Sequence, residues 1–87
     1  MSTRPVDAGL DLELLCDAVE LVGAIQYAHQ DLIQRRIRVG FAKAGRLLYL
    51  MEDAGIIGPL VNGQKRRKVL ITQDQVPATL AVLRGEI

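Results

Sequence analysis

The residues of this sequence best suited to chemistry are its cations, which are concentrated in one segment. Nine of the eleven lysines and arginines lie between Arg35 and Lys68, where the only acidic residues are Glu52 and Asp53. The rest of the chain holds two basic and eight acidic residues. This separation predicts a basic face that attracts a polyanion and an acidic face that repels it. The alternative is an ordinary solvated surface, but the cations also fall on two specific predicted elements.

Groups for catalysis and metal binding are scarce. The sequence has one histidine, His29, and one cysteine, Cys16. A catalytic triad or a histidine or cysteine metal site needs more residues of these types. We therefore expect no enzyme activity, no metal and no cofactor. We expect Cys16 to act as a small buried hydrophobe and His29 to cap a helix.

Composition favours one small domain in a reducing compartment. The chain has 87 residues, of which 49% are hydrophobic and 24% are charged, an ordinary globular composition. A single cysteine allows no disulfide within the chain. No apolar run approaches the ~20 residues that cross a bilayer, and the polar N-terminus does not resemble a signal peptide. We therefore expect a cytoplasmic protein that does not contact a membrane.

Hydrophobic periodicity predicts the elements that position the cations. Glycine ends the turn between the second and third predicted helices, and Asn62-Gly63 is a strong hairpin-turn signal. This order is typical of a winged helix-turn-helix, which is mainly α-helical with a small β-hairpin. It has a three-helix core, a wing and an additional C-terminal helix. The predicted helices span 11–22, 29–36, 41–54 and 74–83, and the predicted strands lie near 25–28, 56–57 and 68–72.

The domain boundaries and the core follow from this order. We divide the chain into a flexible N-terminal tail (1–10), a winged helix DNA-binding domain (11–72) and a C-terminal helix or extension (73–87). The tail carries Pro5 and Gly9 and has little periodic pattern. The predicted core consists of Leu15, Val19, Leu32, Ile33, Phe41, Leu48, Met51, Ile57 and Leu70.

The third predicted helix carries basic residues where a recognition helix meets double-stranded DNA. Only the outward face of a helix in the major groove touches base edges. Here that face offers Lys43, Arg46 and Tyr49. Arg46 is best placed for a bidentate contact to guanine O6 and N7, Lys43 for a base or a phosphate, and Tyr49 for a thymine methyl or a phosphate. The alternative for Arg46 is simple solvation.

Seven further cations fall where winged helices meet the DNA backbone, either in the helix-turn-helix turn or on the wing. We expect them to contact phosphates, which set register rather than sequence and produce a steep salt dependence. Alternate side chains of a hairpin face opposite ways, so two or three of the four wing cations should reach DNA. The predicted phosphate and wing residues are Arg35, Arg36, Arg38, Lys65, Arg66, Arg67 and Lys68.

Residues 32–59 read LIQRRIRVGFAKAGRLLYLMEDAGIIGP. This segment closely resembles the γ domain of the FtsK/SpoIIIE DNA translocases, whose pattern begins L-x-Q-R-R-x-R-[IV]-G-[YF]. The resemblance covers roughly residues 12–72, and residues 40–46 and 80–85 are most similar to actinobacterial members. It implies a winged helix that reads short, G-rich, polar chromosomal motifs and orients a hexameric translocase during chromosome segregation and cell division.

The resemblance also implies site residues and partners. The family's base-reading positions correspond to Ala42, Lys43, Arg46 and Tyr49. Lys43 and Arg46 keep the family chemistry, whereas Ala42 replaces a position often held by Asn and Tyr49 one often held by an acid. The implied partners are G-rich duplex DNA, a translocase motor, a XerD-type recombinase and further copies of the domain on DNA. These place the protein at the nucleoid.

The family's motor requires a Walker A loop, G-x-x-x-x-G-K-[ST], and this sequence contains none. We therefore expect that these 87 residues do not pump DNA by themselves. They are either an excised γ domain or a stand-alone protein built on that module. Two alternatives stay open, namely a stand-alone winged-helix regulator (a phage, plasmid or host repressor or site competitor) and a protein–protein docking module.

Overall fold

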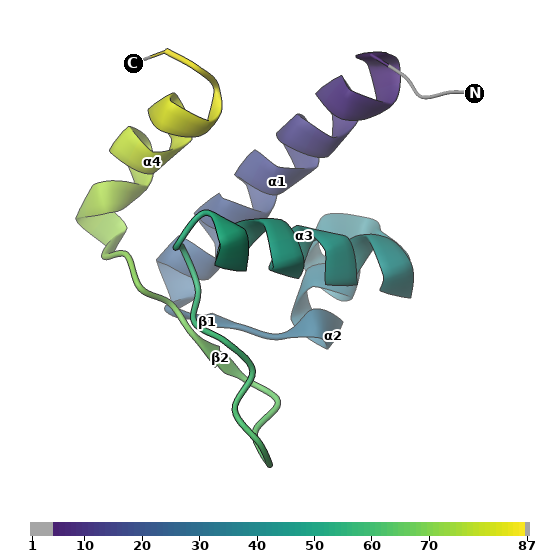
Figure 1. Ribbon diagram of the computed structural model, residues 1–87, viewed down its shortest axis with the longest axis vertical. Coiled ribbons are helices and arrows are strands. Elements are labelled where there is room, and N and C mark those ends of the chain that lie inside the picture. The colour runs from purple at the N-terminus through teal and green to yellow at the C-terminus, as the bar shows by residue number, and fades with distance from the viewer. Residues whose placement is uncertain (1–4, 87) are drawn as a thin grey trace.

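The computed structural model describes residues 5–86 and confirms a mainly helical winged helix with a small antiparallel sheet and an additional C-terminal helix (Figure 1). Within these residues, none of the helices combines the length and the apolar character that crossing a bilayer demands. The elements in order are α1 (Pro5–Ile25), β1 (Tyr27–Ala28), α2 (Gln30–Ile33), the π-helical turn η1 (Gln34–Arg38), α3 (Phe41–Asp53), β2 (Arg67–Lys68), the 3₁₀ turn η2 (Gln73–Gln75) and α4 (Val76–Leu83).

Helix α1 is longer than the sequence predicts. It begins at Pro5, so residues 5–10 of the predicted tail are helical and Asp11 lies inside the helix. The remainder of that tail, residues 1–4, lies outside the described residues. Proline is tolerated in a first turn because an N–H there has no helical partner. The helix ends before Gln26, which has a left-handed backbone (φ 66°) and donates from Nε2 to the Gly23 carbonyl at 2.8 Å.

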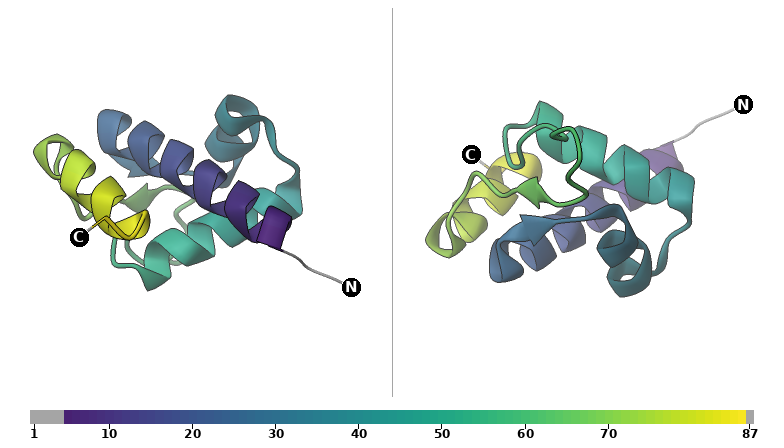
Figure 2. Two further views of the ribbon diagram at one scale, coloured as in Figure 1. Left: turned by 90° about the horizontal axis from the view of Figure 1, so that it is seen from above. Right: turned by 90° about the horizontal axis from the view of Figure 1, so that it is seen from below.

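The core lies where α1 and α3 cross, with α2 and α4 on opposite sides of α1 (Figure 2). Seven of the nine predicted core residues are buried. The exceptions are Phe41 and Leu70, which are 68% and 52% exposed. Phe41 is the first residue of α3 and precedes its first buried position, Ala44. Leu70 follows the buried Val69, and neighbouring residues of an extended strand point to opposite sides.

The helix-turn-helix is formed by α2, η1 and α3. His29 caps α2 as predicted, because its Nδ1 accepts from the Asp31 N–H at 3.2 Å. The predicted second helix then widens into η1, where the Val39 N–H donates to the Gln34 carbonyl at 3.2 Å. The left-handed residue that ends this turn is Arg38, with φ 65°. The predicted four-residue turn is therefore shorter, because η1 continues the helical path through Arg38.

The sheet is shorter than predicted. β2 pairs antiparallel with β1, and Ile57 adds an isolated bridge to Val69 on the other side. Strand β2 ends at Lys68, so the predicted strand over 68–72 begins one residue earlier and does not extend to Thr72. We call the segment 58–68 the wing. Most of it is irregular chain rather than paired strand.

The predicted turn at the tip of the wing is confirmed. The Gln64 N–H donates to the Val61 carbonyl at 2.9 Å, which closes a four-residue turn. Gly63 has φ 81°, a left-handed backbone conformation that residues other than glycine rarely adopt. The Asn62-Gly63 pair therefore reverses the chain at the place where the sequence signal lies.

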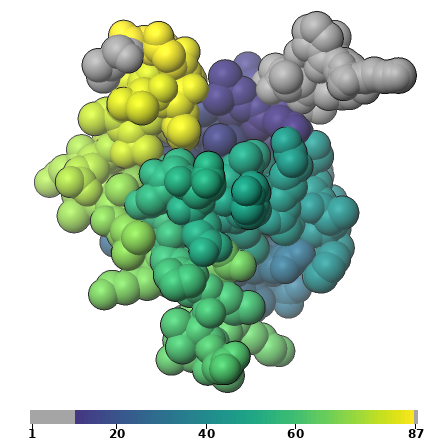
Figure 3. Space-filling model, viewed as in Figure 1, coloured from purple at the N-terminus to yellow at the C-terminus, as the bar shows by residue number. Residues whose placement is uncertain are grey.

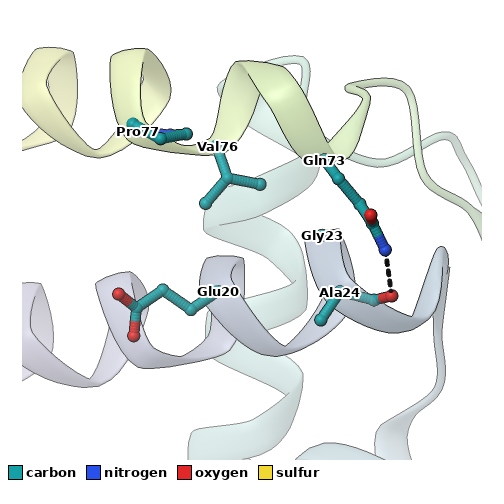
Figure 4. Close-up of a pocket in the computed structure, with 6 residues that line it drawn as sticks. All are labelled: Glu20, Gly23, Ala24, Gln73, Val76 and Pro77. Carbon is teal, nitrogen blue, oxygen red and sulfur yellow. Dashed lines mark hydrogen bonds between the residues drawn. The ribbon is translucent and has the colours of Figure 1, made fainter.

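Helix α4 packs closely on α1 (Figure 4). A Cβ atom at Gly23 would lie 2.3 Å from Val76 Cγ2, so this approach requires glycine. The turn η2, which leads into α4, is also joined to α1 by a hydrogen bond from Gln73 Nε2 to the Ala24 carbonyl at 2.7 Å. Leu80 of α4 is buried in the common core. Gly23 thus allows α4 to pack closely on α1.

Candidate nucleic-acid interface

Helix α3 has one buried side and one exposed side. Its buried residues recur at helical spacing, so residues half a turn away point outward. Three of the four predicted base-reading residues, Ala42, Arg46 and Tyr49, are exposed on this outward side. Tyr49 is 62% exposed. The fourth, Lys43, is half-buried and lies on the flank of α3 that faces α1.

The wing lies beside α3 on one face of the molecule. In Figure 3, α3 crosses the middle of the face and the wing projects below it. The two elements are joined by an ion pair between Arg67 Nη1 and Glu52 Oε1 at 2.9 Å. The outward side of α3 and the exposed wing residues therefore form one continuous surface.

Two predicted base-reading cations share a carboxylate of α1. Lys43 Nζ pairs with Asp11 Oδ1, and Arg46 Nε lies 3.4 Å from Asp11 Oδ2. The Asp11 side chain is 20% exposed, whereas that of Arg46 is 58% exposed. The acidic N-terminal segment and the basic helix therefore meet at this point, and the expected separation into an acidic and a basic face is incomplete. Lys43 and Arg46 lean toward α1 rather than toward the wing.

The Asp11 carboxyl is held in its charged form. Its pKa lies below the ordinary value of 3.8, chiefly because it accepts a hydrogen bond from Lys43, with a smaller contribution from Arg46. Partial burial acts in the opposite direction. Asp11 is therefore a carboxylate throughout the physiological pH range, and its two cations remain attracted to it.

The four wing cations fall into two classes. Arg67 is half-buried and pairs with Glu52, and the Arg66 guanidinium lies over the Tyr27 ring, 4.2 Å from its centroid. Contacts of these kinds fix the wing to the body of the domain. Lys65 and Lys68 are exposed, and within residues 11–86 neither forms an ion pair.

Three arginines occupy the turn before α3. Arg35, Arg36 and Arg38 are all exposed, and Arg35 Nε donates to the Asp31 carbonyl at 3.4 Å. The turn leads directly into the N-terminus of α3, and in Figure 1 it lies behind that helix. Its arginines are exposed to solvent next to the start of α3.

The structure adds residues that sequence reasoning assigned otherwise. Phe41, predicted to be core, lines a groove together with Leu60 and Lys65 of the wing. Gln30 Nε2 donates to the Phe41 carbonyl at 3.0 Å and fixes α2 to the start of α3. Asp11, the first residue of the predicted helix 11–22, lies inside α1 and contacts Lys43 of α3. No local pattern could reveal these roles, because the partners are far apart in the sequence.

The described residues were also compared with the needs of a metal site and of a reactive thiol. Among them, no cluster of three or more His, Cys, Asp or Glu side chains is arranged to hold a metal ion. Cys16 is 1% exposed, as predicted for a small buried hydrophobe. Burial raises the pKa of its thiol, which disfavours the reactive thiolate.

Comparisons with known proteins identify the family of this chain. Residues 11–72 match the family described as the FtsK gamma domain. Over 80 residues, or 92% of its length, the chain is 52% identical to the DNA translocase FtsK of Streptomyces avermitilis. It is 49% identical over 80 residues, again 92% of its length, to the DNA translocase FtsK of Mycobacterium tuberculosis H37Rv. The corresponding identity to the DNA translocase FtsK of Corynebacterium glutamicum is 47% over 79 residues, or 91% of the chain.

The matched region is a small part of each relative. It covers 9% of the Streptomyces protein, 10% of the Mycobacterium protein and 8% of the Corynebacterium protein. The similarity therefore concerns one module of a much larger protein.

Proposed function

The chain belongs to the FtsK gamma domain family, and from this premise we propose that it binds double-stranded DNA in a sequence-specific manner. Its target is a short, G-rich chromosomal motif that has a fixed direction along the chromosome. Binding to this motif orients a DNA translocase. The observation that carries the proposal is that α3, with Arg46 and Tyr49 exposed on its outward side, and the wing, with Lys65 and Lys68 exposed, lie on one face of the molecule.

The outward side of α3 reads the bases. A helix fits the major groove, where arginine forms a bidentate pair with guanine O6 and N7. Arg46 supplies this contact, and the small Ala42 lets the start of the helix approach the base edges closely. Tyr49 contacts a thymine methyl or a phosphate, and Lys43 contacts a base or a phosphate at the flank of the helix.

Cations on either side of α3 hold the DNA backbone. Arg35, Arg36 and Arg38 contact phosphates before the recognition helix, and Lys65 and Lys68 contact them from the wing. Arg66 and Arg67 contribute mainly by fixing the wing, since Tyr27 and Glu52 already engage them. Such contacts set the register of the helix on DNA and carry no base preference.

The domain acts as the sequence-recognition module of a translocase. Its relatives are named DNA translocases and are about ten times its length, which supports a motor as its partner. Several copies bound to neighbouring motifs would increase the small surface that one domain buries on DNA. A XerD-type recombinase is a further proposed partner.

Selection of duplexes from a random library tests the function. We expect enrichment of a G-rich motif that wild type prefers over a composition-matched scrambled duplex in gel shifts. Arg46→Ala should weaken binding of the enriched duplex by about 5- to 150-fold, the contribution of one bidentate arginine–guanine pair. Binding of the scrambled duplex should change much less, because that contact is specific for a base.

Lys65→Ala is the matched control. It also removes one exposed cation, but it should weaken binding of both duplexes by a similar factor, because a phosphate contact carries no base preference. If selection enriches no motif, the proposed function is wrong. If both variants bind like wild type, DNA contacts a different face.

A further inference from the structure

We propose that Asp11 is a positioning residue that orients Arg46 for guanine recognition. The inference rests on the proposed DNA-binding function and extends it to a residue on α1 that does not itself touch a base. Asp11 holds Arg46 through Nε, and Lys43 holds Asp11 through its other carboxylate oxygen.

The geometry leaves the reading end of Arg46 available. Asp11 Oδ2 lies 3.4 Å from Nε, the nitrogen nearest the aliphatic stem. Among the side chains of residues 11–86, no hydrogen bond engages either terminal nitrogen of Arg46. These two nitrogens form the planar fork that pairs with guanine O6 and N7. The guanidinium is therefore tethered at its base while its fork stays accessible.

The carboxylate itself is fixed. Asp11 is on α1, whose central turns pack in the core through Leu15 and Val19, and its side chain is only 20% exposed. Lys43 pairs with Oδ1, so both carboxylate oxygens have a cation. A tether of this kind restricts Arg46 more than an exposed acid on the same helix could.

The tether should raise specificity in two ways. An arginine that is already ordered loses less side-chain entropy when it pairs with guanine, which favours the specific complex. The carboxylate also offsets part of the charge of Lys43 and Arg46, which weakens their attraction to any phosphate. Both effects increase the ratio between specific and non-specific affinity.

The test compares Asp11→Asn with Glu13→Gln. Each variant replaces one carboxylate of α1 by a neutral amide, so the change in net charge is the same. Glu13, however, is exposed and lies on the opposite side of the helix from Asp11. Affinities are measured for the most enriched G-rich duplex and for its scrambled control. We expect Asp11→Asn to lower the affinity ratio by about three- to tenfold, part of the 5- to 150-fold that one arginine–guanine pair supplies. Glu13→Gln should leave the ratio unchanged.

A spectroscopic readout examines the tether without DNA. In wild type the Arg46 Nε–H signal should be resolved and slow to exchange in ¹⁵N NMR spectra, and Asp11→Asn should remove this protection. Asp11→Glu keeps the charge and should retain part of the protection and part of the affinity ratio. If Asp11→Asn does not fold, Asp11→Glu still tests the proposal.

The outcomes separate the two proposals. If wild type discriminates between the duplexes and Asp11→Asn discriminates equally well, the positioning role is wrong and the proposed function stands. If Asp11→Asn binds the G-rich duplex more tightly than wild type and discriminates better, Asp11 competes with DNA for Arg46, which also overturns the inference. If wild type shows no preference, the proposed function fails and the inference fails with it.

Discussion

The individual cations of the proposed interface differ in the contacts that they make within the free protein. Arg46 is tethered through Nε by Asp11, Arg67 is paired with Glu52, and Arg66 stacks on Tyr27. The exposed Lys65 has no such contact within residues 11–86. Residues of one chemical type can therefore serve base reading, wing support or phosphate attraction, according to their neighbours.

The ion pairs of Asp11 predict a dependence of stability on pH. Because the pKa of folded Asp11 lies below 3.8, its ion pairs stabilise the fold above that pH and are lost as the pH falls through the folded pKa. The contribution should be about 0.5–1 kcal/mol, the range of partly exposed ion pairs. Urea denaturation of wild type and Asp11→Asn, from neutral pH to below pH 3.8, measures it.

The difference in unfolding free energy between the two proteins should be largest at neutral pH and should shrink in acid. An equal difference at all pH values would contradict the ionic origin of the effect. Glu13→Gln, which changes an exposed acid of the same helix, is the control.

At the scale of elements, the helix-turn-helix and the wing are positioned by a few long-range contacts. The turn before α3 closes at Arg38, and the wing is fixed by Arg67 and by the bridge between Ile57 and Val69. Each of these elements is short, so its placement depends on the core to which it is attached.

Arg38→Gly should separate stability from DNA binding. Arg38 has φ 65°, a conformation that costs most side chains about 1–2 kcal/mol and glycine very little. Because glycine also makes the unfolded chain more flexible, the net gain in unfolding free energy should be between zero and about 1 kcal/mol. DNA affinity should fall, because one phosphate contact is lost.

Arg38→Ala is the matched control for this pair of effects. It should lose the same DNA affinity without any gain in stability, since alanine keeps the strain. Thermal denaturation and gel shifts measure the two properties. If the glycine variant is clearly less stable than wild type, the left-handed backbone of Arg38 is not the source of strain.

Gly23→Ala should loosen α4 from α1. The new Cβ would meet Val76 Cγ2 at 2.3 Å, so the Val76 side chain or the start of α4 must shift. We expect a loss of about 1–3 kcal/mol in unfolding free energy, as for other overpacked contacts. Adding Val76→Ala should recover part of this loss in chemical denaturation, because it removes the clashing methyl group. If Gly23→Ala alone has the unfolding free energy of wild type, the contact between α1 and α4 adjusts without a loss of stability.

At the scale of the whole molecule, the charges are arranged by face but are not fully separated. Basic residues dominate the wing and the turn before α3, whereas α3 itself carries two basic residues (Lys43, Arg46) and two acidic ones (Glu52, Asp53), and Asp11 of α1 lies beside its cations. In the proposed complex, these acids reduce the attraction to arbitrary phosphates, so that a few cations carry the specific contact. This placement of charges would balance affinity against specificity.

The salt dependence of DNA binding reports this distribution. Lys65→Ala and Lys68→Ala should each reduce the log–log slope of affinity against salt by about 0.9, the value of one phosphate contact. Neither should change the unfolding free energy by more than about 0.5 kcal/mol, since both side chains are exposed. Gel shifts over a salt series and thermal denaturation check both expectations.

Arg67→Ala should behave differently from the lysine variants. Its side chain is 17% exposed and paired with Glu52, so its removal should also destabilise the attachment of the wing by up to about 1 kcal/mol. If it changed only the salt slope, Arg67 would be one more phosphate ligand rather than a support of the wing.

The sequence by itself determined the helices, the turn at Asn62-Gly63, most of the core and the family. These features are written in local patterns, namely hydrophobic period, turn residues and a dense motif over residues 32–59. Periodicity also identified Arg46 and Tyr49 as outward residues of α3, because the spacing of apolar residues along a helix defines its buried and exposed sides; Lys43, predicted with them, lies half-buried toward α1.

Only the tertiary structure decided which charges meet. Asp11 is 32 residues from Lys43 and 35 from Arg46, and Glu52 is 15 from Arg67, so no local pattern links them. The exposed Phe41 and the role of Gly23 likewise depend on how distant segments pack. A side chain's partners are set by the crossing of helices in space, which a one-dimensional pattern does not contain.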